Sequence, residues 1–193
     1  MPRVGLDREA VVEAAIALAD RAGIEGLTIK SLAQKLGVQP PSLYNHVESL
    51  EALRRALALE GMRRLASDFA HATAGRSRDD AVRELARAYR AFARKHPGLY
   101  AASRVAPAKT DTEALHASAR VVGVVVAVLS GYGLSDDDAI HATRALRAAL
   151  HGFVDLETHG GFGLKTDVGA SFERMIDLLT LGLRRVEQAS PRA

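Results

Sequence analysis

The stretch LTIKSLAQKLGVQPPSLYNHV, residues 27–47, decides the fold of this 193-residue chain. Thr28 precedes apolar residues at helical spacing, and a threonine hydroxyl there accepts a hydrogen bond from a backbone N–H of the first turn. Gly37 follows the run, where glycine readily adopts the left-handed conformation that ends helices. Pro40 then opens a short second helix, since its missing N–H costs nothing at the first helical position. The pattern predicts a helix, a tight turn and a second helix.

The second helix is predicted to present polar side chains to solvent, because Val38 and Leu43 have the spacing of inward-facing anchors. No acidic residue occurs from Gly26 to Val47. A short helix braced by another enters the major groove of DNA in many regulators, and a segment without negative charge suits phosphate contact. The alternative is an αα-hairpin with a solvated face. Basic or proton-donating groups in this segment are Lys30, Lys35 and His46.

The quoted motif resembles the DNA-binding domain of the TetR/AcrR family of bacterial transcriptional regulators over residues 5–65. The resemblance rests on Leu27-Thr28, Leu32-Ala33, Leu36-Gly37-Val38 and Ser42-Leu43-Tyr44-Asn45-His46-Val47. It departs at Leu50, where the family often has a lysine that contacts phosphate. The resemblance implies contacts with the DNA backbone from Thr28, Lys30, Tyr44 and His46, and positions close to base edges for Gln39, Pro40, Ser42 and Leu43.

Composition favours helix nearly throughout. Hydrophobic residues make up 48% of the chain and charged residues 25%, as in ordinary globular proteins, and aromatic residues only 5%. The absence of cysteine excludes disulfides, thiolate catalysis and cysteine-based zinc sites. A net charge of +3 is compatible with nucleic acid but is weak evidence for it. No signal peptide is recognisable at residues 1–8, and the longest apolar run, residues 121–129, is far below the roughly 20 residues of a membrane span. We expect a cytoplasmic, all-α protein.

The chain is predicted to form two domains. Residues 5–65 form a three-helix helix-turn-helix DNA-binding domain, with the motif itself at 28–47. Residues 66–193 form a helical effector-binding and dimerisation domain. A long helix, capped by Ser49 and reaching about Ala72, changes its apolar face midway, and we interpret it as the bridge between the two.

Further helices are predicted in the second domain from three-four apolar spacing. Valine-rich residues 121–126 would favour a strand if taken alone, but the flanking helical pattern predicts a helix buried within a bundle. The predicted ranges are about 82–95, 99–103, 115–129, 136–158 and 167–186.

The last two helices carry more apolar surface than one internal contact needs, and small residues there let another helix approach closely. We therefore predict a homodimer through a four-helix bundle, which would demand a near-palindromic DNA operator. The alternative is a monomer with a thick internal core. The predicted interface residues are Ala142, Ala145, Ala149, Gly152, Leu156, Met175, Leu178 and Gly182.

An unknown small-molecule effector is implied by the family resemblance. Residues His151-Gly152-Phe153 and Gly161-Phe162-Gly163 resemble a TetR-like C-terminal domain type named for a Trp-His-Gly triplet, with Leu150 in place of the tryptophan. Ordinary core packing predicts the same aromatic and valine positions as an effector pocket does. The candidate pocket residues are Tyr89, Phe92, Tyr100, Val122, Val125, Val126 and Phe153.

Other chemistry has little support in the sequence. His151, Asp155 and His159 fall four residues apart, which suits a divalent metal, but a polar seam along the helix predicts the same spacing, so we expect no metal and no cofactor. No serine has a Gly-x-Ser-x-Gly setting, and no catalytic residue is proposed. We expect a dimeric, ligand-responsive DNA-binding regulator, more specifically a repressor. The alternatives are a helical enzyme or carrier on the same scaffold and an architectural DNA binder without an effector.

Overall fold

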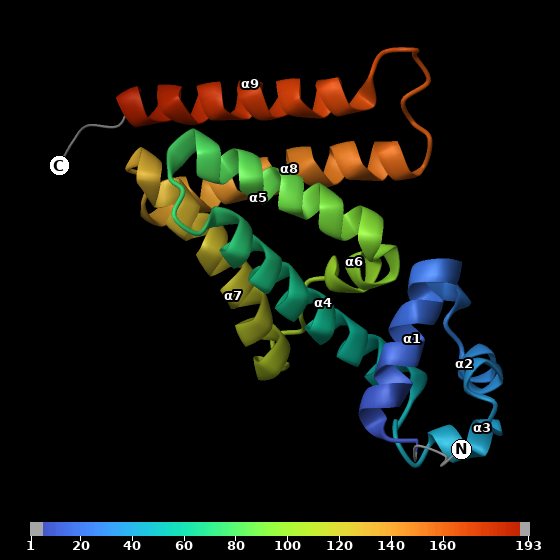
Figure 1. Ribbon diagram of the computed structural model, residues 1–193. Coiled ribbons are helices and arrows are strands. Elements are labelled where there is room, and N and C mark those ends of the chain that lie inside the picture. The colour runs from blue at the N-terminus through green and yellow to red at the C-terminus, as the bar shows by residue number, and fades with distance from the viewer. Residues whose placement is uncertain (1–5, 190–193) are drawn as a thin grey trace. The chain divides into compact units, whose positions relative to one another are not determined.

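The computed structural model describes residues 6–189, and within that range every regular element is a helix (Figure 1). The predicted all-α fold is therefore confirmed for the described residues. The outer limits of the two predicted domains, residues 5 and 193, lie outside that range. Contacts divide the chain into two compact units.

The first unit combines the described part of Met1–Arg64 with Lys95–Ser118. The predicted division placed everything after residue 65 in one domain, and the contacts differ from it because residues 95–118 pack with the N-terminal helices. The elements of this unit are α1 (Arg8–Ala22), the 3₁₀ turn η1 (Ile24–Gly26), α2 (Ile29–Leu36), α3 (Pro40–Leu43), α6 (Pro97–Ser103) and the first parts of α4 (Leu50–Thr73) and α7 (Thr112–Leu129).

The second unit contains Leu65–Arg94 and the described part of Ala119–Ala193. Its last two helices lie side by side (Figure 1). Its elements are the remaining parts of α4 and α7, then α5 (Arg78–Lys95, of which Lys95 belongs to the first unit), η2 (Ser130–Tyr132), α8 (Asp136–Thr158) and α9 (Val168–Ala189).

The helix-turn-helix forms for the local reasons that the sequence indicates. The Thr28 hydroxyl accepts from the Ser31 N–H at 3.0 Å, and the Ser31 hydroxyl accepts from the Thr28 N–H at 3.0 Å. This reciprocal pair fixes the start of α2. Gly37 ends the helix at φ 68°, in the left-handed region that glycine adopts without a steric penalty. The predicted cap and the predicted stop are both confirmed.

The second helix of the motif is shorter than its apolar spacing indicates. α3 is a single turn, Pro40–Leu43, and Tyr44 closes it by donating its N–H to the Pro41 carbonyl at 3.2 Å. Gln39 makes no side-chain capping bond. Pro40 and Pro41 have no backbone N–H, but the N–H groups of a first helical turn have no acceptor within the helix, so no hydrogen bond is lost. The helix ends after its fourth residue, Leu43.

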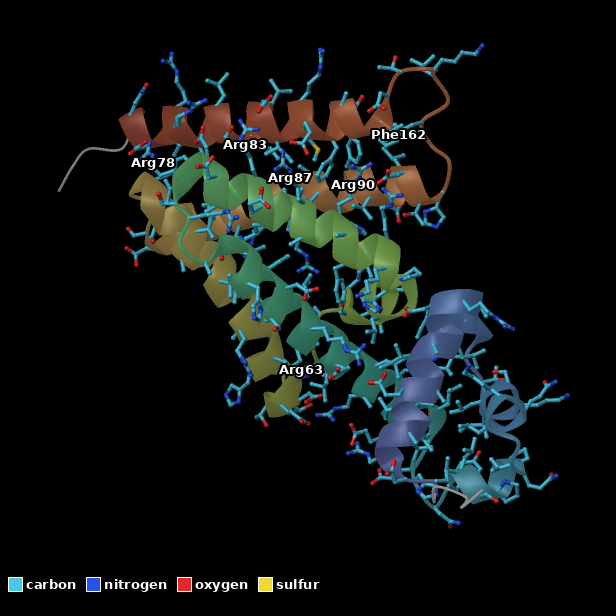
Figure 2. The ribbon with its side chains drawn as sticks, viewed as in Figure 1. Arg63, Arg78, Arg83, Arg87, Arg90 and Phe162 are labelled. Carbon is cyan, nitrogen blue, oxygen red and sulfur yellow. The ribbon has the colours of Figure 1, made fainter. Side chains whose placement is uncertain are left out.

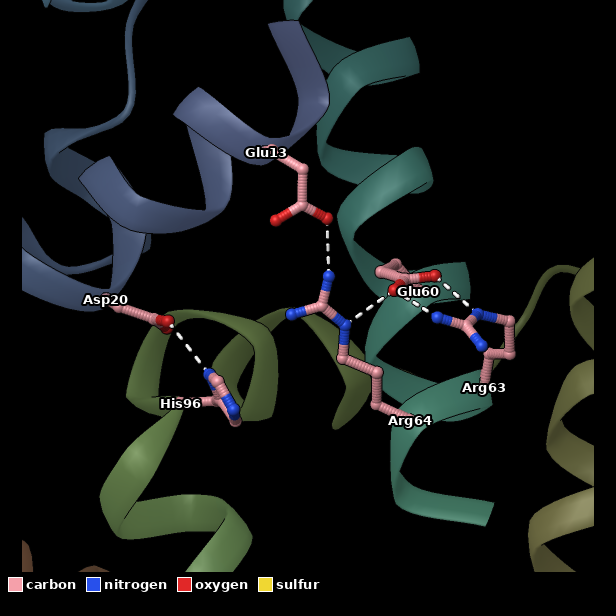
Figure 3. Close-up of polar contacts among 6 residues, drawn as sticks. All are labelled: Glu13, Asp20, Glu60, Arg63, Arg64 and His96. Carbon is pink, nitrogen blue, oxygen red and sulfur yellow. Dashed lines mark hydrogen bonds and ion pairs between the residues drawn. The ribbon is translucent and has the colours of Figure 1, made fainter. Parts of the chain in front are cut away.

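A carboxylate on α1 caps α6 across space. Asp20 accepts the N–H groups of Gly98 at 2.8 Å and Leu99 at 3.3 Å through one oxygen. Its other oxygen lies 3.2 Å from Nδ1 of His96 (Figure 3). A carboxylate suits this place, because the first N–H groups of a helix lack partners within it. His96 is thus a polar residue of this contact, and α6 begins at Pro97 rather than at the predicted residue 99.

A second set of polar contacts within the first unit involves Arg64 of α4. Its guanidinium donates to Glu13 of α1 and to Glu60 one turn earlier on α4, and Glu60 also accepts from Arg63 at 2.6 and 2.7 Å (Figure 3). These hydrogen bonds hold the pKa of Glu60 below its ordinary value. Glu60 therefore stays charged at neutral pH, and Arg64 links α1 to α4 through Glu13.

In the second unit, arginines spaced along α5 pair with acidic residues of α9 and α8 (Figure 2). The order of the pairs shows that α5 and α9 run antiparallel, since the first arginine meets the last glutamate. The more exposed of these pairs set register more than they stabilise. The pairs are Arg78 with Glu187, Arg83 with Asp177, Arg87 with Glu173 and Arg90 with Glu157.

Arg90 is the most enclosed member of this series. It donates two hydrogen bonds to Glu157, at 2.8 and 2.5 Å, and these hold the pKa of that carboxyl below its usual range. Its guanidinium carbon also lies 4.8 Å from the ring centre of Phe172. The Phe153 ring contacts Phe172 edge to face at 5.1 Å and Phe162 in a tilted arrangement at 4.8 Å. Phe162, in the segment Gly161-Phe162-Gly163, and Glu157 thus stabilise the turn between α8 and α9, the first by its contact with Phe153 and the second by its contact with Arg90.

The valine-rich segment is helical, as predicted, but it is not surrounded by its own chain. Val125, Val128 and Leu129 of α7 are buried, whereas Gly123 and Ala127 are exposed. An 18-residue window within Thr112–Tyr132 has a mean hydropathy of 1.7 with only 22% of it buried, and so reaches the length and composition of a membrane span. The apolar part of this helix is therefore longer than the uninterrupted apolar run at residues 121–129.

The close fit of α6 on α1 generates a prediction about Gly98. An added Cβ there would lie 2.6 Å from the Cβ of Ala19 and from the backbone nitrogen of Asp20, and backbone cannot move aside. Gly98→Ala is expected to destabilise the protein by roughly 1–3 kcal/mol, the usual cost of overpacking. Gly123→Ala is the matched control, because a Cβ there meets nothing within 4 Å and alanine favours helix. Urea unfolding followed by circular dichroism measures both, and equal stability of the two variants would contradict the described contact.

Candidate nucleic-acid interface

The residues assigned to DNA contact lie on α2 and on the turn around α3. Thr28 and Lys30 are exposed at the start of α2, and Gln39 is exposed just before α3. Tyr44 keeps 56% of its surface accessible. A tyrosine exposed to this extent next to a single helical turn gains little from the core and is available for an external partner. Pro40, Ser42 and His46 are half-buried beside them.

Leu43 does not belong to this surface. Its side chain is 0% exposed, as are those of Leu27 and Leu32, so it is a core residue. The resemblance implied a position near base edges for it, and the structure corrects that assignment, since a fully buried side chain cannot reach a base. Its burial holds the single turn of α3 against the unit and leaves the flanking polar residues outside.

The charge of this surface is positive. No acidic residue occurs from 26 to 47, and Lys30 and Lys35 are both exposed on α2. Lys35, which the family resemblance does not assign to DNA contact, adds a second exposed cation to the same helix. Such a surface suits the phosphate backbone.

The candidate effector residues are divided between the two units. Tyr100 belongs to the first unit and the other six to the second, and all seven are buried or half-buried. Burial of this kind is what ordinary core packing also produces. The cavity of about 350 Å³ that the structure describes lies within the first unit, and none of the seven residues lines it. Sequence spacing does not predict this cavity, because its walls come from separate parts of the chain: η1, α4, α6, the segment before α7 and the start of α7.

The candidate dimer residues lie on α8 and α9 of the second unit and are exposed or half-buried. Leu178 is 70% exposed and Leu156 49% exposed. Leu181 and Val186, which the sequence reading did not assign to the interface, are 58% and 46% exposed on the same helix, α9. Ala145 and Gly182 are exposed, and the remaining members are half-buried: Ala142, Ala149, Gly152 and Met175.

The histidine and aspartate spacing on α8 does not produce a metal centre in the described part of the chain. Within residues 6–189 no group of three or more histidine or acidic side chains is placed to hold a metal ion. His159 lies just past the end of α8, where its Nδ1 is 2.8 Å from the Asp155 carbonyl oxygen. The helix face that would have aligned it with His151 has ended there.

Comparison with known proteins agrees with this description. Residues 11–57 match the family model described as bacterial regulatory proteins of the tetR family, and residues 82–179 match the tetracyclin repressor-like C-terminal domain. The chain is 43% identical over 181 residues to an HTH-type transcriptional regulator of Mycobacterium tuberculosis, spanning 93% of this chain and 83% of that protein. It is 38% identical to an HTH-type transcriptional regulator of Bacillus subtilis, spanning 94% and 95% of the two chains.

A solved structure shares the fold. A TetR variant from Acinetobacter baumannii, crystallised in complex with minocycline, superposes with a TM-score of 0.71 at 25% identity, covering 95% of this chain and 99% of that one. The fold and the exposed helix-turn-helix define a DNA-binding transcriptional regulator rather than an enzyme. The chain belongs to the TetR family of bacterial transcriptional regulators.

The different burial of two neighbouring residues predicts different effects on stability. Leu43→Ala should destabilise the protein by about 2–5 kcal/mol, because it leaves a cavity in the core. Tyr44→Ala should stay within about 0.5 kcal/mol of the parent, because its side chain faces solvent. Chemical denaturation without DNA measures both. A large loss of stability on Tyr44→Ala would show that its ring is part of the core.

Proposed function

We propose that this regulator is a homodimeric repressor that binds a near-palindromic operator and is released from it by a small-molecule effector. The observation that carries the proposal is the surface around α3, where Tyr44 and Gln39 are exposed while Leu43 anchors the turn. A single helical turn held in this way presents its polar residues to a groove. Such a function places the protein in the cytoplasm, where bacterial DNA lies.

The DNA contacts divide into two kinds. Thr28, Lys30, Tyr44 and His46 are proposed to hold the phosphate backbone, because hydroxyl, ammonium and imidazole groups donate to phosphate oxygens. Gln39, Pro40 and Ser42 lie at or next to the start of α3 and are proposed to face base edges. Of these, Gln39 has the amide that can both donate to and accept from an adenine edge.

The proposed dimer uses the apolar surface of α8 and α9. Leu178 is 70% exposed, and Leu181 and Val186 are exposed on the same helix. Together they form more apolar surface than a soluble monomer usually exposes on one helix. A second copy would bury it in a four-helix bundle, with two helices from each chain. The two-fold axis would then pair two copies of α3 with two half-sites of the operator.

The effector is proposed to act by shifting a population. A molecule that binds better to one arrangement of the DNA-binding parts lowers operator affinity by the ratio of its two affinities. The solved relative with minocycline supports ligand binding for a protein of this fold. The seven buried residues of the candidate pocket remain a proposal for where such a ligand would bind.

Operator binding tests the assignment of individual residues, once a site has been selected from random duplex DNA. Tyr44→Ala and Lys30→Ala should weaken binding to every duplex, and Lys30→Ala should reduce the salt slope by about one unit. Gln39→Ala should relax preference at one base pair, at a cost of about 1–3 kcal/mol on the preferred sequence. Fluorescence anisotropy over a salt series measures all three. Lys165→Ala, in the exposed loop before α9, is the control. Unchanged operator affinity in Tyr44→Ala would refute this docking arrangement.

Sedimentation velocity tests the dimer. The parent protein is expected to sediment as a dimer, and Leu178→Glu should raise the dissociation constant by at least about thirty-fold, because it buries a charge at an apolar contact. Leu164→Glu carries the same change at a residue that is 86% exposed in the loop between α8 and α9, and it should leave the dimer intact. A monomeric parent, or equal dissociation of both variants, would contradict the proposed interface.

A further inference from the structure

The cavity of about 350 Å³ in the first unit has a predominantly apolar wall. Short side chains leave the space open, since alanines of α4, α6 and α7 contribute to the lining. Its larger apolar members include Ile24 of η1, Met62 of α4 and Val105 in the segment after α6. Small-molecule sites have volumes of roughly 300–1,000 Å³ and mostly apolar walls. The cavity therefore reaches the size and character of such a site.

The charged groups of the lining already have partners of opposite charge. Arg55 donates to both oxygens of Asp111, at 2.5 and 2.7 Å, and to Glu113 at 2.8 Å. These contacts lower the pKa of Asp111 to about 2, so this carboxylate stays charged and paired at ordinary pH. Arg54 pairs with Glu25 at 3.5 Å, and its Nε, which has no hydrogen-bond partner, is buried out of reach of a molecule in the cavity. The two arginines and two carboxylates of the lining cancel in formal charge.

This balance of charge decides the class of ligand. An ion of either sign would lose hydration on entering the cavity and would find no opposite charge without a partner, whereas a neutral apolar molecule has no such hydration to lose. Volume limits its size. An engineered cavity of about 150 Å³ holds one benzene molecule, so a cavity of about 350 Å³ suits a molecule with two fused rings.

Val105 lies at the rim of the cavity, because it belongs to the lining and yet is 74% exposed. The segment that carries it runs between two helices whose first turns are capped by carboxylates. Asp20 caps α6 at Gly98, and Asp111 caps α7 by accepting the N–H of Ala114 at 3.1 Å. An apolar side chain held at this rim is removed from water when a molecule fills the cavity, which favours binding.

We propose that this cavity binds a neutral apolar molecule with about two fused rings, in contact with Ile24, Met62 and Val105. Charged molecules of the same shape bind more weakly, because the charges of the site are already paired. The site belongs to the first unit alone, and none of the seven candidate effector residues lines it. It is therefore a ligand site additional to the pocket proposed above.

Fluorescence titration of the full-length chain with prodan, a neutral naphthalene derivative whose emission shifts to the blue in apolar surroundings, tests the site. Prodan should bind saturably at one site per chain with a blue shift. Three competitors of one shape then report the preferred charge. Neutral acetylnaphthalene should displace prodan, whereas naphthoate and naphthylmethylammonium should each need a concentration at least about ten-fold higher, because a charge must be dehydrated.

Two pairs of variants locate the bound probe. Ala58→Leu fills the lining and should weaken prodan binding by at least about ten-fold, whereas Ala56→Leu, at a half-buried position of α4 outside the lining, should not. Val105→Ser removes apolar surface at the rim and should weaken binding by about three-fold. Its control is Leu164→Ser, since Leu164 is 86% exposed in the second unit. Unfolding curves show whether each variant is folded, and the exposed pair changes little that the fold depends on.

Three results would overturn the proposal. They are the absence of saturable prodan binding, equal affinities in Val105→Ser and Leu164→Ser or in folded Ala58→Leu and Ala56→Leu, and displacement by naphthoate or naphthylmethylammonium at the same concentration as by acetylnaphthalene. No DNA is present in these titrations, so their outcome is independent of whether the chain is a repressor.

Discussion

The contact of α6 with α1 is the constraint on which the first unit depends. Gly98 lies so close to Ala19 that no side chain fits between the two helices, and Asp20 completes the contact by accepting the N–H groups that open α6. Shape and hydrogen bonding thus act at the same point. Because α1 also packs on α2, the helix-turn-helix and the segment 95–118 belong to one compact body.

The second unit is organised by charge on one side of α9 and by apolar surface on another. Arg78, Arg83 and Arg87 pair with acidic residues of α9 and fix its register against α5. Leu178 and Leu181 are left exposed. The ion pairs hold α9 against α5 of its own chain. The separate apolar face of α9 remains exposed for contact with a second chain.

Local signals in the sequence predicted most of the helices and the outward-facing residues of the DNA-binding motif, because caps, glycine stops and apolar spacing act within a few residues. The same spacing showed Leu43 pointing inward, and only the family resemblance placed it near bases. The capping of α6 by Asp20, the pairing of Arg55 with Asp111 and the cavity beside Arg54 could not be predicted. Each depends on residues more than fifty positions apart, and no local pattern encodes such contacts.

The two prolines that open α3 have a consequence for recognition. Pro40 and Pro41 have backbone angles φ that their rings hold fixed, and Leu43 secures the turn from the inside. The segment therefore has few alternative conformations to give up when it meets a partner. A recognition element that is ordered before binding loses little conformational entropy on association. A flexible loop of the same length would bind more weakly, because part of its interaction free energy would be offset by the entropy lost on ordering.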